Sequence, residues 1–298
     1  MEVNVLAEAR TGKRSPQVLR ALAQSATFEL AGASAVELLE WTAQTFPGNA
    51  VATQSMANTA LTTLIESFTP QIPVLFVDTG YHFEETLETR DRIATRVEVL
   101  TISSALTIAE QAERFGADLW NSDPDRCCAM RKVAPLTDLL SGKEAWVSGL
   151  RRSTATTRVD WQPIAYDDAK DVVKVSPLLL WTDDELAAFT AEHDVITNPL
   201  LDSGYPSIGC APCTRHVNPG EDQRAGRWSG FDKTECGIHS PYTLTRATHL
   251  ASQAHPSHSR GPGDGGKARC VGPSMDMGRC VDRSGPRRSP SGRWRLRH

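Results

Sequence analysis

Two pairs of cysteines lie about eighty residues apart in this chain, in patterns typical of metal binding. Cys127 and Cys128 are adjacent, whereas Cys210 and Cys213 form a CxxC unit. Four thiolates in a reducing compartment suit tetrahedral zinc or an iron–sulfur cluster. Adjacent thiolates reach one ion poorly, but each can bind a separate iron of a cubane. The spacing therefore favours a [4Fe–4S] cluster over zinc, and unligated buried cysteines are a third interpretation.

A fifth cysteine, Cys236, has the surroundings expected of a nucleophile. It lies in the segment KTECGIH, directly before Gly237 and three residues before His239. Glycine permits a mobile backbone, and a nearby imidazole or arginine lowers a thiol pKa. A thiol with a lowered pKa can act as a nucleophile, although an incidental surface thiol fits the same pattern. Cys270 and Cys280 receive no role.

Several basic residues lie in polar, loop-like stretches of an otherwise acidic body. Guanidinium groups bind phosphate and sulfate oxygens in a bidentate manner, so such residues predict a bound polyanion. Any one of them could instead be a solvated surface cation, but together they favour a nucleotide-like anion. The residues are Lys132, Arg151, Arg152, Arg158, Arg224 and Arg227.

Strands alternate with helices along the part of the chain that must position these side chains. The continuous apolar run at 73–80 is typical of a strand buried on both faces of a parallel sheet. Alternation of this kind predicts an α/β fold with a doubly wound, mostly parallel sheet. The expected strands are 49–55, 73–80, 96–102 and 143–150. The first ~30 residues are expected to be helical and solvent-facing, and further helices are expected at 35–46, 57–68 and 82–94. A last helix is expected to start at the capping box formed by Thr182 and Glu185.

Two of these strands end in residues that suit ligand binding. TQSMANT (53–59) follows the first strand and VDTG (77–80) ends the second. Ligands of such sheets bind at the carboxyl ends of the strands, near helix N-termini. Neither segment is a Walker A loop or a Rossmann fingerprint, so ordinary strand-to-helix turns remain the alternative.

Composition separates a body, residues 1–240, from a tail, residues 241–298. The 298-residue chain is 40% hydrophobic, but the tail is basic and rich in Gly, Pro and Ser, so we expect it to be disordered or an unselected extension. It lacks interleaved aromatic residues, which argues against a nucleic-acid partner. The chain has no secretory signal and no apolar run of ~20 residues, so we expect a cytoplasmic protein with no membrane contact. The sequence is compatible with a monomer and with a homo-oligomer.

Six segments, taken in order, resemble the assimilatory adenylylsulfate (APS) reductases of the APS/PAPS reductase family. They are VDTGYHFEET, CC-x-x-RK, GLRR…TR, GYPSIGCAPCTR, RAGRW and KTECGIH, and the likeness spans roughly residues 20–240. The resemblance implies an adenine nucleotide alpha hydrolase-like (PP-loop) fold. It also implies thiol-dependent reduction of APS to sulfite and AMP during sulfate assimilation, in a catalytic domain of residues 1–240.

The same resemblance assigns roles to individual residues. Cys236 would attack the sulfur of APS, AMP would leave, and thioredoxin or a similar dithiol protein would release sulfite from the resulting thiosulfonate. His239 belongs to the same terminal motif. The cluster ligands would be Cys127, Cys128, Cys210 and Cys213. The residues expected at the substrate are Lys132, Arg151, Arg158, Arg224 and Arg227, with Ser55, Asn58 and Thr59 in the PP-loop position and Asp78, Thr79 and Gly80 in the second nucleotide loop.

Two departures from the family pattern stand out, and two rival functions remain. The 53–59 loop has no glycine, and a long extension follows the terminal ECGIH motif. One rival is a cluster-containing reductase of the 3′-phosphorylated substrate PAPS. Family members without the cluster cysteines generally use PAPS, so the four cysteines favour APS. The other rival is a zinc-bound PP-loop nucleotide-binding or thiolation protein.

Overall fold

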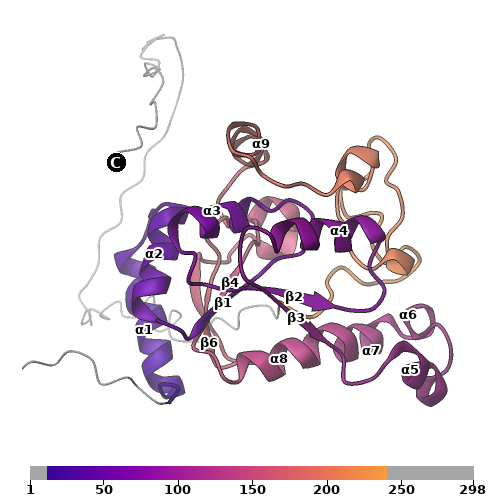
Figure 1. Cartoon of the computed structure of the whole chain (residues 1–298), viewed down its shortest axis with the longest axis horizontal. Coiled ribbons are helices and arrows are strands. Elements are labelled where there is room, and N and C mark those ends of the chain that lie inside the picture. The colour runs from indigo at the N-terminus through magenta and orange to yellow at the C-terminus, as the bar shows by residue number, and fades with distance from the viewer. Residues whose placement is uncertain (1–11, 240–298) are drawn as a thin grey trace, which may run out of the picture. The chain divides into compact units, whose positions relative to one another are not determined.

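A sheet of six strands runs through the part of the chain that the computed structural model describes, residues 12–239 (Figure 1). The strand order is β3-β2-β1-β4-β6-β5; β5 is antiparallel to β6, and all other neighbours are parallel. The expected α/β fold with a mostly parallel sheet is confirmed. The strands are β1 (Ala50–Thr53), β2 (Val74–Asp78), β3 (Val99–Ser103), β4 (Ala145–Ser148), β5 (Ile164–Asp167) and β6 (Val172–Val175). The predicted boundary at 240/241 and the tail lie outside the described residues.

Helices precede, connect and follow these strands. The capping box predicted at Thr182 and Glu185 is present at the start of α9. None of the described helices is long and apolar enough to cross a membrane. The α-helices are α1 (Pro16–Glu29), α2 (Ala35–Thr45), α3 (Ala60–Phe68), α4 (Glu84–Ile93), α5 (Ile108–Phe115), α6 (Leu119–Ser122), α7 (Pro124–Cys128), α8 (Ala134–Leu140) and α9 (Asp183–Glu192). A π-helical turn, η1 (Ala129–Val133), joins α7 to α8, and the 3₁₀ turns are η2 (Arg152–Thr154), η3 (Thr156–Arg158), η4 (Pro199–Ser203) and η5 (Ala211–Cys213).

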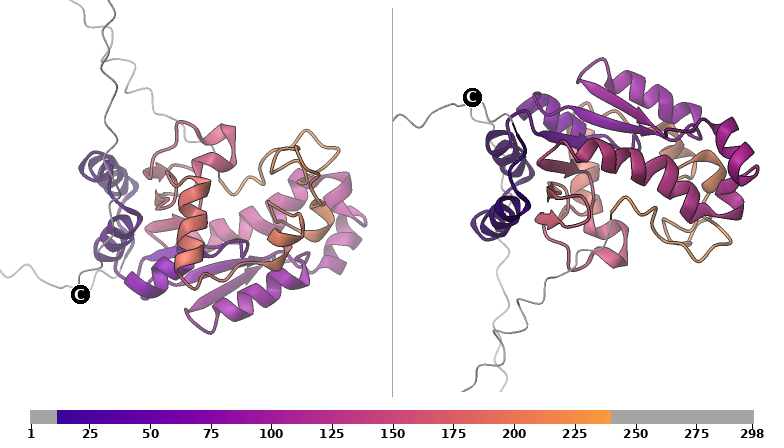
Figure 2. Two further views of the ribbon diagram at one scale, coloured as in Figure 1. Left: turned by 90° about the horizontal axis from the view of Figure 1, so that it is seen from above. Right: turned by 90° about the horizontal axis from the view of Figure 1, so that it is seen from below.

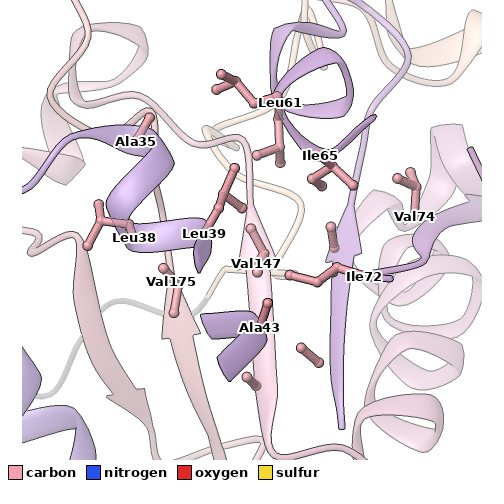
Figure 3. Packing of buried hydrophobic residues seen from close by; sticks show 14 of the residues in the cluster. Ala35, Leu38, Leu39, Ala43, Leu61, Ile65, Ile72, Val74, Val147 and Val175 are labelled. Atoms are coloured by element: carbon pink, nitrogen blue, oxygen red, sulfur yellow. The ribbon is translucent and has the colours of Figure 1, made fainter. Parts of the chain in front are cut away.

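Both faces of the sheet are covered, because alternate residues of each strand point to opposite sides. Ala52, Val147 and Val175 pack with residues of α2 and α3 on one face (Figure 3). Val51 and Trp146 pack against α8 on the other face. Figures 1 and 2 show α8 running along the side of the sheet opposite α3. The prediction that the first helix faces solvent is wrong for α1, which buries Leu19, Ala23 and Ala26.

The order of the strands places a topological switch beside β1. The chain runs from β1 through β2 to β3 at one edge, and then returns to β4 on the other side of β1. The connections that leave β1 and β4 therefore diverge above the carboxyl ends of these two strands. An open α/β sheet binds its ligands at such a point.

A buried ion pair fixes the start of the described chain to the opposite end of the sheet. Arg14 Nη2 lies 2.6 Å from Glu144 Oε2, and the Glu144 side chain is only 3% exposed. We expect Arg14→Ala to lower the free energy of unfolding by about 3 kcal/mol, because a buried carboxylate loses its guanidinium. Urea unfolding followed by circular dichroism measures this loss.

The matched control is Arg20→Ala, which removes an ion pair of similar length from the surface. Arg20 Nη2 lies 2.6 Å from Asp168 Oδ1, but both side chains are well exposed. Exposed pairs contribute less than about 1 kcal/mol. Equal losses in the two variants would contradict the assignment of Arg14–Glu144 as a stabilising buried pair.

Candidate active site

A cavity of about 430 Å³ lies at the switch point predicted by the sheet order. Its walls include the loops that follow β1 and β4, the turn η1, and three segments within residues 200–239. This size is typical of a small-molecule site. The predicted residues that line it are Ser55, Asn58, Lys132, Arg151, Arg158, Arg224, Arg227, Cys236 and His239.

The glycine-free loop after β1 makes the sharp turn that a glycine would normally make. Met56 has φ of 57°, in the left-handed region, and its side chain is fully buried. Asn198 holds this turn: its Nδ2 donates to the Met56 carbonyl (3.1 Å) and its backbone N–H to the Ala57 carbonyl (2.8 Å). Burial and these bonds offset the backbone strain, so the absence of glycine does not prevent the loop from reaching the cavity.

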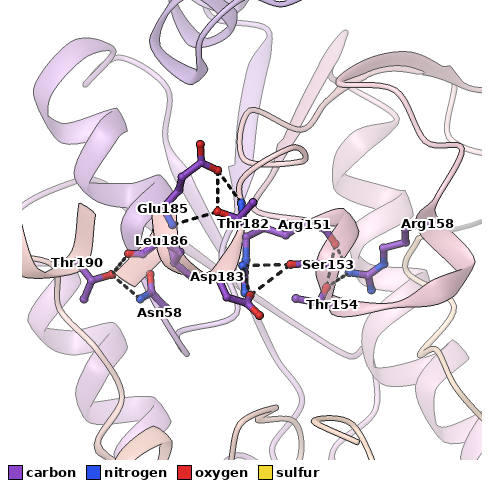
Figure 4. Close-up of polar contacts among 10 residues, drawn as sticks. All are labelled: Asn58, Arg151, Ser153, Thr154, Arg158, Thr182, Asp183, Glu185, Leu186 and Thr190. Carbon is purple, nitrogen blue, oxygen red and sulfur yellow. Dashed lines mark hydrogen bonds and ion pairs between the residues drawn. The ribbon is translucent and has the colours of Figure 1, made fainter. Parts of the chain in front are cut away.

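Ser55 and Asn58 lie on the cavity side of this loop, and Thr59 lies behind it. The Asn58 amide donates to Thr190 Oγ1 of α9 at 3.0 Å, which ties the loop to that helix (Figure 4). The Thr59 hydroxyl is buried and donates to the Ile196 carbonyl at 2.6 Å. Thr59 is not one of the residues that line the cavity in the described chain.

The predicted second nucleotide loop, Asp78 to Gly80, faces the cysteines. The Thr79 hydroxyl lies 3.3 Å from Cys210 Sγ, and Asp78 Oδ1 accepts a hydrogen bond from the backbone N–H of Gly80 at 2.8 Å. Gly80 has φ of 73° and packs tightly against Arg131. Within the described chain, none of these three loop residues lines the cavity at the switch point. Their role at the nucleotide stays a prediction.

The arginines after β4 are held by acidic and hydroxyl side chains at the rim of the cavity (Figure 4). Arg151 Nη1 forms an ion pair with Asp183 Oδ1 at 2.5 Å. Arg158 donates from Nη1 to Thr154 Oγ1 (2.7 Å) and from Nη2 to Glu235 Oε1 (2.5 Å). Burial lowers the pKa of Arg158, and Glu235 partly offsets this effect. Arg152, which the sequence also singled out, instead donates to the Trp161 carbonyl at 2.5 Å.

Arg227 enters the cavity across a glycine that leaves room for it. A Cβ atom at Gly209 would lie 2.1 Å from Arg227 Nη2, so a larger residue there would displace the guanidinium. Arg227 donates to Ser207 Oγ (3.3 Å) and the Ile208 carbonyl (3.2 Å). The Nε atoms of Arg227 and Arg158 are buried without hydrogen-bond partners among the described residues. Buried donors without partners are costly, so both are suited to bind an anion from the cavity.

The four paired cysteines line one small second cavity. Burial and the neighbouring thiols raise the pKa of Cys127 to about 12 and that of Cys213 to about 11. Thiolates at these positions would therefore need a bound cation, and a metal supplies one. Among residues 12–239, no three His, Cys, Asp or Glu side chains are arranged to hold a single metal ion. The donor set, four thiols converging from α7 and the CxxC turn η5, fits an iron–sulfur cluster.

Lys132 lies between the two cavities and lines both. The π-helical turn η1 follows directly after the cysteines of α7 and turns this lysine toward them. Burial opposes the ammonium charge, but attraction to negative charge on the sulfur atoms of Cys210, Cys236 and Cys128 raises the lysine pKa. Arg131 is buried beside the cysteine cavity only and donates to the Thr79 carbonyl and to Gln111 Oε1. Of the two basic residues after the cysteine pair, only Lys132 faces the larger cavity.

The segment that carries Cys236 lines the larger cavity and is anchored on both sides of the cysteine. Before the cysteine, Lys233 forms an ion pair with Asp125 of α7. After it, the His239 ring stacks on the Trp146 indole with centroids 5.0 Å apart and planes 7° apart. Desolvation and the cations Lys174 and Arg158 hold the pKa of His239 well below its usual range, so the imidazole is neutral.

Comparison with known proteins places this arrangement in a family. Residues 49–216 match the phosphoadenosine phosphosulfate reductase domain. The chain belongs to the APS/PAPS reductase family. A Streptomyces coelicolor protein named adenosine 5′-phosphosulfate reductase is 45% identical over 229 residues, which cover 76% of this chain and 97% of that protein. A protein of the same name from Mycolicibacterium smegmatis is 46% identical over 223 residues, 74% of this chain and 94% of the relative.

A solved structure supports the same family fold. The phosphoadenylyl-sulfate (PAPS) reductase of Candida auris, crystallised as a phosphate complex, superposes with a TM-score of 0.58 and is 26% identical. The match covers 69% of this chain and all of that one. The predicted membership of the APS/PAPS reductase family is therefore confirmed.

Four residues around the candidate active site were not predicted as site residues from the sequence. Trp228 lines both cavities, and only its position in the RAGRW motif marked it. Trp146 is fully buried in β4 and supports His239, and Lys174 in β6 lies 4.7 Å from the same indole. Burial lowers the Lys174 pKa to about 7. Glu235 carries a charge directly beside Cys236, and its partners emerge only from the fold.

Proposed function

We propose that this chain reduces APS to sulfite and AMP, with electrons from thioredoxin or a similar dithiol protein. The observation that carries the proposal is the meeting of one thiol and several cations at a single cavity. Cys236, Lys132 and the predicted arginines reach it from distant parts of the chain. The relatives from Streptomyces coelicolor and Mycolicibacterium smegmatis, named for this reaction, support the choice of substrate. As a thiol-dependent enzyme it would act in the cytoplasm, where dithiol proteins stay reduced.

The first step transfers a sulfonate group to Cys236. The thiolate attacks the sulfur of APS, a sulfur–sulfur bond forms, and the bond from sulfur to the phosphate oxygen breaks. Both electrons of the broken bond leave with AMP, whose phosphate gains negative charge. Lys132, Arg158 and Arg227 would stabilise that charge more strongly in the transition state than before it. The neutral His239, stacked on Trp146, would hold the terminal segment so that Cys236 lies at the cavity.

The second step releases sulfite by exchange with a dithiol. A thiolate of the partner attacks Cys236 Sγ, and sulfite departs with the electron pair of the sulfur–sulfur bond. The partner's second thiol then attacks the mixed disulfide and frees Cys236 as a thiolate. In total, two thiols become a disulfide and APS gains two electrons. The partner must reach Cys236, which lies in a partly exposed segment at the cavity mouth.

Cys127, Cys128, Cys210 and Cys213 would hold a [4Fe–4S] cluster beside this site. The convergence of four thiols, three of them buried, and the high pKa values of Cys127 and Cys213 support this assignment. The cluster would contribute structural support and charge beside Lys132, since the electrons come from thiols. Arg131 and Thr79 would secure the loop over the cysteines through their mutual hydrogen bond.

Metal analysis tests the cluster directly. Anaerobically purified protein should contain about four irons and four sulfides per chain and should be brown. Cys128→Ser should lose most of the iron, whereas Cys236→Ser should retain all of it, because Cys236 faces the other cavity. A colourless protein with one zinc per chain would overturn the cluster and favour the zinc-bound PP-loop alternative.

A sulfite assay tests the substrate. We expect sulfite release with APS and reduced thioredoxin, and at least about a hundredfold lower kcat/KM with PAPS. A buried site that lacks partners for the extra phosphate rejects a charged group strongly. Faster turnover with PAPS would assign the same fold and nucleophile to the other substrate of the family. Turnover of neither would overturn the proposed function.

A further inference from the structure

The carboxylate next to the reactive cysteine occupies two of the arginines at the cavity. Glu235 Oε1 lies 2.5 Å from Arg158 Nη2, and Glu235 Oε2 lies 3.2 Å from Arg224 Nη2. Each oxygen contacts a different guanidinium, so the carboxylate bridges the two cations. The Arg158 side chain is 5% exposed and the Glu235 side chain 21%, so the contact is largely shielded from water.

A phosphate or sulfate group would use the same donors as this carboxylate. Both kinds of anion offer two oxygens to guanidinium N–H groups. Arg158 has few donors to spare: its Nη1 contacts Thr154 Oγ1 and its Nη2 contacts Glu235, and only Nε is without a partner among the described residues. An anion that takes the Nη2 N–H now donated to Glu235 displaces this carboxylate, and one that takes the other Nη2 N–H together with Nε lies beside a like charge, so either mode of binding weakens the Glu235 contact.

Displacement of Glu235 would move Cys236, because the two residues are consecutive. The anchors on either side do not use these arginines, since Lys233 pairs with Asp125 and His239 stacks on Trp146. Between them, Gly237 has φ of 81°, a conformation that glycine leaves easily. Within the segment, the Thr234 carbonyl also accepts a hydrogen bond from Arg224 Nη2 at 2.6 Å, so an anion that occupies Arg224 and Arg158 would loosen residues 234–237 while Lys233 and His239 stay bound.

We propose that Glu235 is a displaceable internal counter-ion that couples the anion bound at Arg158 and Arg224 to the position of Cys236. This rests on the proposed function, which supplies the anion as the phosphosulfate or phosphate of an adenine nucleotide. Without the anion, Glu235 neutralises the two arginines and holds Cys236 against the cavity. With the anion bound, Glu235 is released and Cys236 becomes more accessible.

Two measurements on the full-length holoprotein test this coupling. Calorimetry gives the affinity for AMP, and we expect Glu235→Gln to bind AMP about tenfold more tightly, because the competing charge is gone. The alkylation rate of Cys236, followed by peptide mass spectrometry, should rise several-fold in the wild type at saturating inorganic phosphate. In Glu235→Gln it should be high already and insensitive to phosphate.

Two further variants separate competition for the arginines from mere loosening of the segment. Glu221→Gln is the matched control, because Glu221 pairs with Arg215 at 2.9 Å and does not line the cavity. It should change neither measurement. Lys233→Gln removes the Asp125 anchor without touching the arginines, so alkylation should accelerate while AMP affinity stays the same.

Wild-type AMP affinity in a folded Glu235→Gln protein would overturn the proposal, and so would a wild-type alkylation rate that phosphate lowers or leaves unchanged. If Glu235→Gln fails to fold, Glu235→Asp replaces it, since a shorter carboxylate reaches both arginines poorly and should also tighten AMP binding. The proposed function is tested independently of this coupling. If the two Glu235→Gln effects are observed but the wild type releases no sulfite from APS, the proposed reaction is refuted and the coupling stands.

Discussion

Replacement of Cys236 by serine should lower sulfite release from APS by at least about a thousandfold. A serine hydroxyl is not ionised near neutral pH and cannot form the thiosulfonate, so both steps of the proposed reaction are lost. The cavity walls contributed by β1, β4 and η1 do not depend on this side chain. AMP affinity and iron content should therefore match the wild type.

The control for this variant is Cys270→Ser, which removes a cysteine to which we assign no role. It should retain full turnover, and so exclude a general effect of thiol loss. Residual turnover above about a tenth of the wild-type rate in Cys236→Ser would show that another group attacks the substrate. The identification of the nucleophile would then be wrong, although the fold and family would stand.

Replacement of Lys132 by alanine should lower kcat by about 10²- to 10³-fold, the typical cost of removing one preorganised charge from a transition state. Lys132 lines both cavities and contacts Cys210, so its side chain lies between the cysteines and the larger cavity, where the phosphosulfate is proposed to bind. Most of the effect should appear in kcat, because charge on the phosphate increases as AMP leaves. AMP affinity should fall less than kcat.

Lys143→Ala is the matched control for Lys132→Ala. Lys143 donates to the Gly48 carbonyl at 3.1 Å and does not line either described cavity. Its replacement should leave kcat within about twofold of the wild type, within the usual effect of a surface substitution. The iron content of the Lys132 variant must be measured as well. Equal loss of iron and kcat would show that Lys132 supports the cysteine site rather than the reaction.

Four of the six strands were predictable from their apolar runs, and β5 and β6 were not. The run at 73–80 became β2, and the predicted strands at 49–55, 96–102 and 143–150 contain β1, most of β3 and β4. The strands β5 and β6 were missed because β5 offers only three uncharged residues before Asp167, and Lys174 interrupts the apolar pattern of β6. Burial of Lys174 between two indoles depends on contacts that periodicity does not encode.

The residues of the candidate site were predictable in kind, but their partners were not. The cysteine pairs and Cys236 could be identified from spacing, and the structure brings the four paired cysteines to one cavity. The sequence marked Lys132 and not Arg131 as a site residue, but their neighbours emerged only from the π-helical turn that carries both. The role of Asp78, Thr79 and Gly80 at the nucleotide stays a prediction, and the contact between Thr79 and Cys210 emerged only from the fold. Long-range contacts of this kind depend on the order of the strands.

The central claim is that Cys236 receives the sulfonate group of APS, and mass spectrometry tests it most directly. The reduced, cluster-loaded protein is incubated with APS in the absence of any dithiol, and its peptides are then analysed. We predict one SO₃ adduct per chain, located on Cys236, together with release of one equivalent of AMP. An unmodified Cys236, or an adduct on a different cysteine, would contradict the account.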